Sequence, residues 1–522
     1  MANLPDFITS NQPVPQDARI SWTKSIAPAY AGIMLWYAFW QGLICLGNFG
    51  DSSAAILSQG VAPALGALVA AAAVCYVLFY YVPGMLGMKT GRPLAVVGTS
   101  VFGAKGGFLL PGFLMGLLQF GWLAVNATFA SILLWQCIKG DYTTANALIV
   151  KDQLFWILSV VFIIAAVFVA QKGMKYVGLL GQFAVIVPLV ILVMLLIPTY
   201  KGISNFKPDM IGAKAVVEQG APAAIEAETT PAAGQDAAPA AAEAAATEPA
   251  AAEAVATAEE PVVDAKATEG AAPVKSWTIL AIFLGVIAYV SGFFATAGAA
   301  GVDIASPSRN KSDVIWGGFF GVFLATVVAG GVAILTVAGA YGSGIAGVAG
   351  NNPVGMLNAI WGKNIALVIN ILLVVTAFPA ACVASLIGVT GLKTTLSKVP
   401  PILSIGICTF GAIVICVTGA GLDAGAIFGF IGASFGPVCG AMMAEYILSK
   451  GEWVGPRAGF SPAGWLAWLF GFVVGNWNAL PMIKISPSLG FEMPCPPVSA
   501  FIVGFVVYFL FCGLRTRVVE PN

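Results

Sequence analysis

Twelve stretches of this chain are apolar for long enough to cross a bilayer, and that feature restricts the fold more than any other. A helix needs about 20 largely apolar residues to cross the hydrocarbon core. Inside a bilayer every backbone polar group must find its partner within the protein, so runs of this length are expected to be helical. We therefore predict an all-α polytopic membrane protein with twelve transmembrane helices, at residues 26–48, 62–83, 107–137, 153–170, 177–198, 277–301, 315–340, 364–390, 401–418, 425–448, 461–480 and 497–513.

The composition agrees with a membrane protein and excludes several kinds of function. Only 9% of the 522 residues are charged, against about 25% in soluble domains. The chain contains no histidine, which excludes His-based triads, zinc-protease motifs and His proton relays. Its nine cysteines have no CxxC spacing, so they indicate neither a disulfide framework nor a metal site. We expect no enzyme activity, no cofactor, no metal and no nucleic-acid partner.

Lysine and arginine residues concentrate in alternate loops between the predicted spans. Cytoplasmic loops carry an excess of these residues, and the excess appears when the N-terminus is placed inside. We therefore expect a multi-pass protein of the cell membrane with both termini in the cytoplasm. Residues 1–25 would be a cytoplasmic tail without a cleavable signal, and residues 451–522 would hold the last two helices and the C-terminal tail.

The segment at 201–276 does not resemble the membrane spans on either side of it. From about 213 to 273 it consists mainly of Ala, Glu, Pro and Thr, without an aromatic residue before Trp277. Such a composition cannot bury enough apolar surface to offset the entropy of ordering. We predict a disordered extracytoplasmic linker between one group of helices at 26–200 and a second at 277–450. A docking arm or an external gate is the alternative.

The sixth predicted span contains small residues that weaken a helix. Ser291-Gly292 and the run 297–301 lie in its middle and second half, and glycine costs about 1 kcal/mol relative to alanine inside a helix. One interpretation is a close helix–helix contact; the other is a discontinuous helix at a transporter's binding site. The first span has a comparable weak run, from Trp40 to Gly47. Broken first and sixth helices predict a five-plus-five inverted repeat with two extra C-terminal helices.

Three groups of residues, in the sixth, third and tenth spans, form recognisable motifs. In the sixth span they are Gly292–Gly298, then Asp303 and Arg309. The third span contributes Phe-Gly-x-Lys-Gly at 102–106, Pro111 and Gly121-Trp122, and the tenth contributes Gly436-Pro437 and Glu445-Tyr446. These motifs resemble the nucleobase:cation symporter-1 family, the permeases for cytosine, purines and hydantoins, which has aspartate where this chain has Glu445. The resemblance implies a secondary transporter that carries a nucleobase such as cytosine, or a related small planar heterocycle, by alternating access.

The resemblance also implies a substrate site on the third and sixth spans. Trp122 and Asn126 are four residues apart and share a helix face. An indole can stack on a base, and an amide can both donate and accept hydrogen bonds, although both side chains could serve packing alone. The family pattern adds Phe294 and Thr296, and Gln41 of the first span is a further candidate.

Three charged residues near the cytoplasmic helix ends have a structural and a functional interpretation. Asp303 and Arg309 could form an ion pair at the inner gate. Glu445 lies near Lys450 and could form a cytoplasmic ion pair with it. In a chain without histidine, Glu445 is also the carboxylate nearest the core that could carry a coupling proton.

The eighth span departs from the family pattern. Phe378 is followed by Pro379, Ala380 and Cys382, where the family has a Ser/Thr pair and an asparagine-containing run. Sodium requires oxygen ligands, and a thiol is a poor substitute, so a proton is favoured over sodium as the coupling ion. The other expected partners are a small-molecule substrate and the lipid bilayer, with a monomer as the working expectation.

Two alternatives remain open on the sequence alone. The same scaffold could transport allantoin, a hydantoin or a vitamin precursor. It could also be a membrane sensor that no longer transports, which the losses in the eighth span favour. The retained pairs Trp122/Asn126 and Phe294/Thr296 argue against that second alternative.

Overall fold

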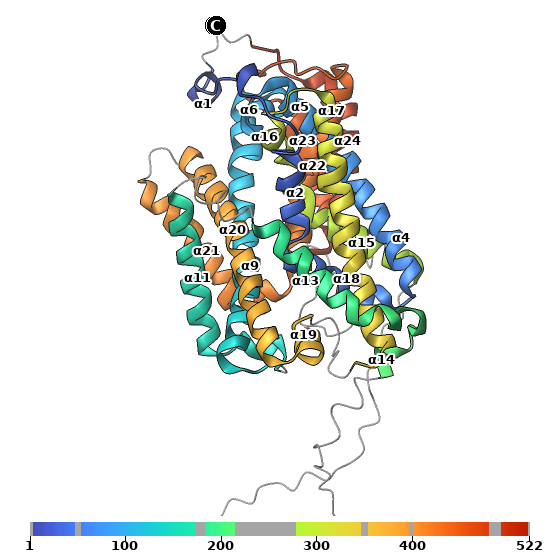
Figure 1. Cartoon of the computed structure of the whole chain (residues 1–522). Coiled ribbons are helices and arrows are strands. Elements are labelled where there is room, and N and C mark those ends of the chain that lie inside the picture. Colours follow the sequence, from blue (N-terminus) through green and yellow to red (C-terminus); the bar gives the residue numbers. More distant parts are fainter. Residues whose placement is uncertain are drawn as a thin grey trace, which may run out of the picture.

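The protein is a bundle of helices in which the described chain contains no strand longer than an isolated bridge (Figure 1). The computed structural model describes residues 4–46, 54–142, 144–172, 183–213, 278–345, 353–395, 400–479 and 492–519. Eight of its helical stretches are long and apolar enough to cross a membrane, and three shorter apolar helices accompany them. The chain is therefore a multi-pass membrane protein.

The helices coincide with the predicted spans, although crossings by the shorter helices stay a prediction. In the first half they are α2 (Ile26–Met34), α3 (Tyr37–Ile44), α4 (Val61–Val74), η3 (Cys75–Tyr80), α5 (Tyr81–Thr90), α8 (Ala104–Gly107), η4 (Phe108–Leu114), α9 (Met115–Lys139), α11 (Gln153–Gln171) and α13 (Phe183–Thr199). In the second they are α15 (Ile279–Ala299), α16 (Gly301–Ala305), α17 (Lys311–Gly318), η6 (Phe319–Leu324), α18 (Ala325–Gly342), α20 (Lys363–Thr395), α21 (Pro401–Val417), α22 (Ala424–Leu448), α23 (Pro462–Gly475) and α24 (Pro496–Leu510).

The first span is broken, but not where its weak run predicts. The break lies at Leu35-Trp36, where Trp36 adopts an extended conformation (φ −59°, ψ 134°). Gln41 and Gly42 instead lie inside α3, whose eight residues are all buried. Packing overrides the weak helix propensity at Gln41-Gly42, whereas α3 ends at Ile44, within the predicted run, and Gly47 lies outside the described residues. The hydroxyl of Tyr289 donates to the carbonyl oxygens of Ala38 and Phe39, at 3.1 and 3.2 Å, and so anchors the segment after the break.

The sixth span contains both predicted features, a close helix–helix contact and a helix interruption, at two different places. The helix is continuous through Ser291-Gly292, and the interruption comes at Ala300, between α15 and α16. At Gly292 the backbone of α15 lies against α22, and a Cβ there would stand 2.8 Å from the carbonyl oxygen of Phe428. Gly292 therefore serves a close helix contact, whereas the run 297–301 ends the helix.

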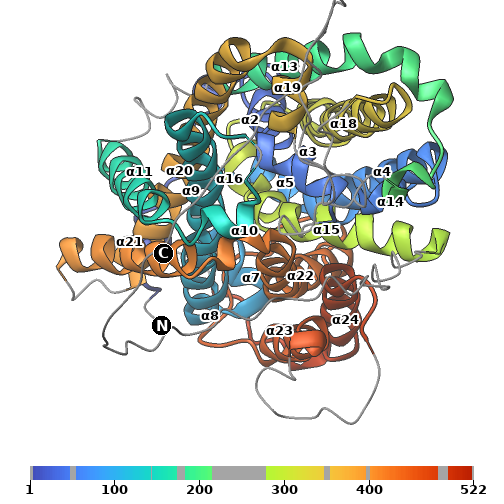
Figure 2. The same ribbon diagram turned by 90° about the horizontal axis from the view of Figure 1, so that it is seen from below.

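Corresponding irregularities in the two halves agree with an inverted repeat. The first span of each half is interrupted, and the second span of each half contains a π-helical turn, η3 in one and η6 in the other. The halves also interleave: α9 of the first packs on α20 of the second, and α4 of the first packs on α15 of the second. In Figure 2, α9, α11, α20 and α21 group on one side of the bundle, apart from α22–α24.

The segment before the first span is packed on the bundle. It includes the short helix α1 (Asp6–Thr9), and Arg92 donates to the carbonyl oxygens of Ile8 and Asn11. Arg19 donates to the carbonyl oxygens of Met88 and Ser308. Ile8 of α1 packs on Ala104, whose backbone N–H donates to the carbonyl oxygen of Arg457, and Arg457 donates to the carbonyl oxygen of Thr516. The two ends of the described chain therefore lie on one side of the bundle. That this side is cytoplasmic stays a prediction.

The chain also stays folded beyond the predicted end of the first group of helices. A 3₁₀ turn, η5 (Tyr200–Asn205), and the short helix α14 (Met210–Ala213) follow α13, and η5 packs against α18. The linker predicted from 201 therefore starts later than expected. Residues 214–277 lie outside the described part of the chain, so the disorder and the extracytoplasmic location predicted for them stay predictions.

Candidate substrate site

Trp122 and Thr296, two of the predicted substrate-site residues, meet in the interior of the bundle. The indole N–H of Trp122, on α9, donates to the hydroxyl of Thr296, on α15, at 3.1 Å. Both side chains are buried. Because 174 residues separate them in sequence, this hydrogen bond joins the two halves of the chain. The structure thus brings together two residues that the resemblance assigned to one site.

Three more aromatic rings surround Trp122. The ring centroids of Phe293 (α15) and Phe428 (α22) each lie 4.8 Å from that of Trp122, and the ring of Trp36 lies 6.0 Å away. We call Trp36, Trp122, Phe293 and Phe428 the aromatic cluster. Tilted aromatic pairs at such distances contribute about 0.5–1.5 kcal/mol each beyond their buried area. The cluster therefore joins the broken first span to the third, sixth and tenth.

Glycines allow the helices to come this close. A Cβ on Gly121, next to Trp122, would stand 2.8 Å from a side-chain carbon of Ile427 on α22. Gly432 of α22 lies against Gly292 of α15, where a Cβ would come within 2.6 Å of the facing Cα. Small residues at such crossings let helix backbones approach in membrane proteins. The Gly-Trp step of the third span thus positions the indole between α15 and α22.

Within the part of the chain that the structure describes, several polar atoms close to the aromatic cluster lack hydrogen-bond partners. Asn126 donates its amide N–H to the carbonyl oxygen of Trp122 at 2.8 Å, but its Oδ1 is buried and accepts no hydrogen bond. The indole N–H of Trp36 and Oε1 of Gln41 are likewise buried without partners. An unsatisfied buried polar group costs about 1–3 kcal/mol. Two acceptors and one donor beside a set of flat rings match what the edge of a polar heterocycle requires.

Gln41 lies on the side of the first span that faces α9. It follows Tyr37 by one helical turn, and the ring of Tyr37 lies 6.1 Å from that of Phe129. Phe129 comes three residues after Asn126 on α9. Residues three or four apart are neighbours on a helix surface, so Gln41 and Asn126 face the same region from two helices.

The two adjacent phenylalanines of the sixth span point in different directions. Phe293 contacts Trp122, whereas the ring of Phe294 lies 5.5 Å from that of Tyr30 on α2. The hydroxyl of Tyr30 donates to the carbonyl oxygen of Ala297 at 2.9 Å, so this contact fixes α2 against the small-residue run. Phe294 is also part of a continuous helix, so no unwound backbone lies beside it. Sequence reasoning selected Phe294 and missed Phe293, Trp36 and Phe428; in the sequence, the four-residue step from Tyr289 to Phe293 is the one available signal.

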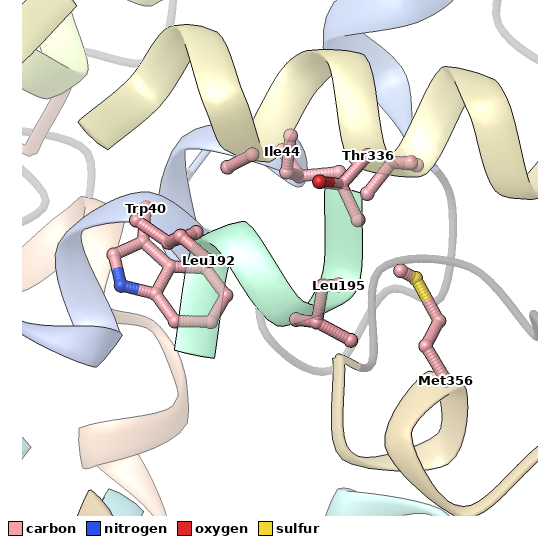
Figure 3. Close-up of a pocket in the computed structure, with 8 residues that line it drawn as sticks. Trp40, Ile44, Leu192, Leu195, Thr336 and Met356 are labelled. Atoms are coloured by element: carbon pink, nitrogen blue, oxygen red, sulfur yellow. The ribbon is translucent and has the colours of Figure 1, made fainter. Parts of the chain in front are cut away.

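The cluster is closed in this structure. For a planar ring to lie between Trp122 and Phe293, their separation must reach about 7–8 Å, twice an optimal carbon–carbon contact, but it is 4.8 Å. A hollow of about 10 Å³ lies farther along α3, between Trp40, Leu192, Leu195, Thr336 and Met356 (Figure 3). It has room for about one water molecule. At this end α3, α13 and α18 therefore pack tightly.

The predicted ion pair between Asp303 and Arg309 is not formed. Arg309 instead binds Asp313 of α17 with two bonds, at 2.9 and 3.0 Å. Asp303 accepts from the backbone N–H of Leu94, at 3.1 Å, at the start of α6 (Leu94–Val97). Arg309 and Asp313 are four residues apart and lie next to each other at the start of a helix, so sequence spacing could have indicated this pair.

Glu445 forms a dense network, but not with Lys450. Its carboxylate accepts from Arg457 at 2.7 Å, from Arg515 at 2.9 Å and from the hydroxyl of Tyr508 at 2.8 Å. We call these four residues the Glu445 network. Arg457 also donates to the carbonyl oxygens of Ser100 and Thr516, in addition to its bond with Glu445. The network therefore joins α22, α24 and the chain before the third span, and it lies apart from the aromatic cluster.

The eighth span does not contribute to the aromatic cluster through the residues singled out in the sequence. The ring of Phe378 lies 5.5 Å from that of Phe162 and so faces α11. The hydroxyl of Thr376 donates to the carbonyl oxygen of Leu373 at 2.8 Å. Asn370, which is fully buried, is a residue that sequence reasoning overlooked. It lies beside Cys137, 15 residues after Trp122 on α9 and so about 22 Å along that helix.

Comparison with known proteins supports the fold. No protein-family model and no curated protein sequence matches the chain. Among solved structures, Mhp1 in its inward-facing conformation aligns over 98% of this chain and 93% of its own, with 15% identity and a TM-score of 0.59. Mhp1 in a closed conformation with bromovinylhydantoin bound, described as a nucleobase-cation-symport-1 family transporter, aligns over 97% of this chain and 94% of its own, with 13% identity and a TM-score of 0.53. The resemblance seen in the motifs is thus confirmed in three dimensions: this chain has the fold of a nucleobase-cation-symport-1 transporter.

Proposed function

We propose that the protein is a secondary active transporter that carries a nucleobase, or a related small planar heterocycle, across the membrane by alternating access. The observation that supports this most directly is the site at the Trp122–Thr296 bond. It combines flat rings with unpartnered acceptors on Gln41 and Asn126. Stacking of one base on one aromatic side chain contributes about 1–3 kcal/mol, and the polar atoms would select the ring edge. The bound hydantoin of the Mhp1 structure is a ligand of the same chemical class.

The position of the site suits alternating access. Trp122 and Thr296 belong to different halves of the chain, and the aromatic cluster draws on four spans that can separate. In transporters with inverted repeats, substrates bind where the repeats meet, near broken helices. The breaks at Leu35-Trp36 and at Ala300 lie next to Trp36 and Thr296. Opening of the closed cluster by roughly 3 Å would admit one planar ring, by the contact distances above.

The proposal on coupling is that transport does not use sodium. The eighth span lacks an adjacent Ser/Thr pair, because Pro379 and Ala380 carry no side-chain oxygen and Cys382 offers sulfur in its place. Glu445 is a poor candidate for a proton carrier, because three donors occupy its carboxylate. Transport is then driven by the substrate gradient or by protons on another carboxylate.

The experiment that tests the function compares two neighbouring side chains. Purified protein is screened by thermal shift against cytosine, uracil, purines, hydantoin and allantoin, since a ligand of the folded state raises the apparent melting temperature. The affinities of Phe293→Leu and Phe294→Leu for the ligand that raises the melting temperature are then compared with that of the wild type. Phe293→Leu is expected to weaken binding by about 0.5–1.5 kcal/mol, the contribution of one aromatic pair. Phe294→Leu, which changes the contact with Tyr30, is expected to retain the wild-type affinity if it folds.

Three outcomes would change this proposal. If no planar heterocycle shifts the melting temperature, the substrate class is wrong. If Phe294→Leu loses binding and Phe293→Leu does not, the site lies on the other face of α15. If the ligand binds but proteoliposomes show no flux, the chain is a sensor on a transporter scaffold.

A further inference from the structure

A second hollow lies at the end of the bundle that carries α1, far from the aromatic cluster. It measures about 410 Å³ and is lined by α1, α8, η4 and the loop before α23, a size within the range of small-molecule sites. Its apolar lining includes Phe7, Phe108, Leu109 and Phe460, and its charged lining consists of Asp6 and Lys105. Nothing in the proposed transport mechanism uses it.

The walls of this hollow are held in place. Ile8 of α1 is buried against Val96 and Ala104, and Arg92 donates to two carbonyl oxygens of the segment that contains α1. The rings of Phe7 and Phe108 lie 5.4 Å apart. The backbone N–H of Lys105 donates to the carbonyl oxygen of Gly459 at 2.9 Å, which sets Phe460 next to the start of the third span.

The hollow carries one negative and one positive side chain, which suits a ligand with a group of each sign. Asp6 and Lys105 line the same space, yet in the described part of the chain neither side chain takes part in an ion pair or a hydrogen bond. Both residues are exposed. A lysine ammonium binds phosphate as a point charge, and a carboxylate accepts from an ammonium group. A headgroup with a phosphate and a primary amine complements this pair.

The apolar part of the hollow and its location indicate a lipid. Lys105 stands at the beginning of the membrane-crossing stretch Ala104–Lys139, which is the depth at which headgroups lie. Phe460 is 48% exposed, and its ring lies 5.5 Å from that of Trp465, a residue type that is enriched at the membrane–water interface. A soluble zwitterion would leave the apolar wall of the hollow, which includes Phe108, Leu109 and Phe460, in contact with water.

We propose that this hollow binds one phosphatidylethanolamine molecule, with its phosphate on Lys105, its ammonium on Asp6 and the start of its acyl chains against Phe7, Phe108 and Phe460. Phosphatidylcholine binds less well, because its quaternary ammonium cannot donate hydrogen bonds. Phosphatidylglycerol binds less well too, because it carries no positive charge for Asp6. The lipid would tie α1 to the third span.

The test measures lipid binding by the delipidated, full-length protein with native mass spectrometry and thermal shift. The probes are dioleoyl phosphatidylethanolamine, the corresponding phosphatidylcholine and phosphatidylglycerol, and the soluble headgroup glycerophosphoethanolamine. Wild-type protein is expected to prefer phosphatidylethanolamine. Lys105→Ala and Asp6→Asn are each expected to weaken that binding by about tenfold, the loss of one charge-assisted hydrogen bond. Lys311→Ala, at another exposed lysine, is the control and is expected to bind as the wild type does.

Equal binding of the three lipids by the wild type would overturn the proposal. An unchanged preference in both Lys105→Ala and Asp6→Asn would also overturn it. Comparable binding of glycerophosphoethanolamine would mean that the hollow takes a soluble zwitterion and that the acyl chains play no part. Because Asp6 and Lys105 are exposed, both variants are expected to fold. The melting temperature of each variant without lipid checks this.

Discussion

The aromatic cluster and the Glu445 network both join distant parts of the chain, but they differ in the hydrogen bonding of the polar atoms around them. Around Glu445 each carboxylate oxygen accepts at least one hydrogen bond from an arginine, and Tyr508 adds a third donor. Around Trp122 the polar atoms of Trp36, Gln41 and Asn126 remain unpartnered. A network whose polar atoms are all hydrogen-bonded stabilises one arrangement of the helices. Polar atoms without partners beside flat rings are instead available to bind a ligand.

The largest expected effect comes from breaking the network. Glu445→Ala leaves the guanidinium groups of Arg457 and Arg515 without their counter-charge, and removing one partner of a buried ion pair costs about 3–5 kcal/mol. Thermal unfolding in detergent measures the loss. Glu452→Ala is the matched control, because the Lys89–Glu452 pair is exposed (71% for Glu452) and such pairs contribute about 0–1 kcal/mol. Equal melting temperatures for the two variants would show that the network does not lock this end of the bundle.

The next effect falls on the aromatic cluster and on ligand affinity instead of folding. Trp122→Ala removes the stacking surface and the donor to Thr296, so the affinity for the heterocycle should fall by about 1–3 kcal/mol. Trp135→Ala is the control: this tryptophan is buried on the same helix, 13 residues and so about 20 Å farther along. Equilibrium binding on folded protein measures both. Wild-type affinity in Trp122→Ala would refute the stacking role.

A smaller effect separates stability from binding at a single side chain. Asn126→Leu removes a buried oxygen that accepts nothing, so the melting temperature should stay the same or rise. The affinity should fall by about 0.5–1.5 kcal/mol, the net contribution of one hydrogen bond. Gln136→Leu, whose buried Oε1 also lacks a partner, should leave the affinity unchanged. A loss of stability in Asn126→Leu without a loss of affinity would assign Asn126 to packing.

The smallest expected effect is that of sodium. Replacing sodium with choline in the external medium should change uptake into proteoliposomes by less than about twofold, because Pro379, Ala380 and Cys382 stand where an adjacent Ser/Thr pair would supply hard oxygen ligands. Initial rates at several sodium concentrations measure this. A strong, saturable stimulation by sodium would contradict the proposal and indicate a cage of backbone carbonyls.

The fold class and the order of the spans could be predicted from the amino-acid sequence. Helix formation in a bilayer depends on local apolar length, which can be read residue by residue. The small-residue runs also indicated that the first and sixth spans are interrupted. They did not place the first break, because the packing of α3 overrides the weak propensity of Gln41-Gly42. The Gly-Trp step correctly placed Trp122 near Thr296 only through the family resemblance.

Tertiary structure alone decided which side chains meet. Phe293 and Phe294 are equivalent candidates in the sequence, because both are phenylalanines of the same span. Neighbouring side chains on a helix point about 100° apart, and the rotation of α15 turns Phe293 toward Trp122 and Phe294 toward Tyr30. The partners of Glu445 could not be predicted from the sequence either, since Arg515 lies 70 residues away. The prediction therefore chose Lys450, the basic residue nearest to Glu445 in the sequence. Apolar length is a property of the chain, but contacts across a bundle depend on how each helix is rotated and where its glycines let it approach.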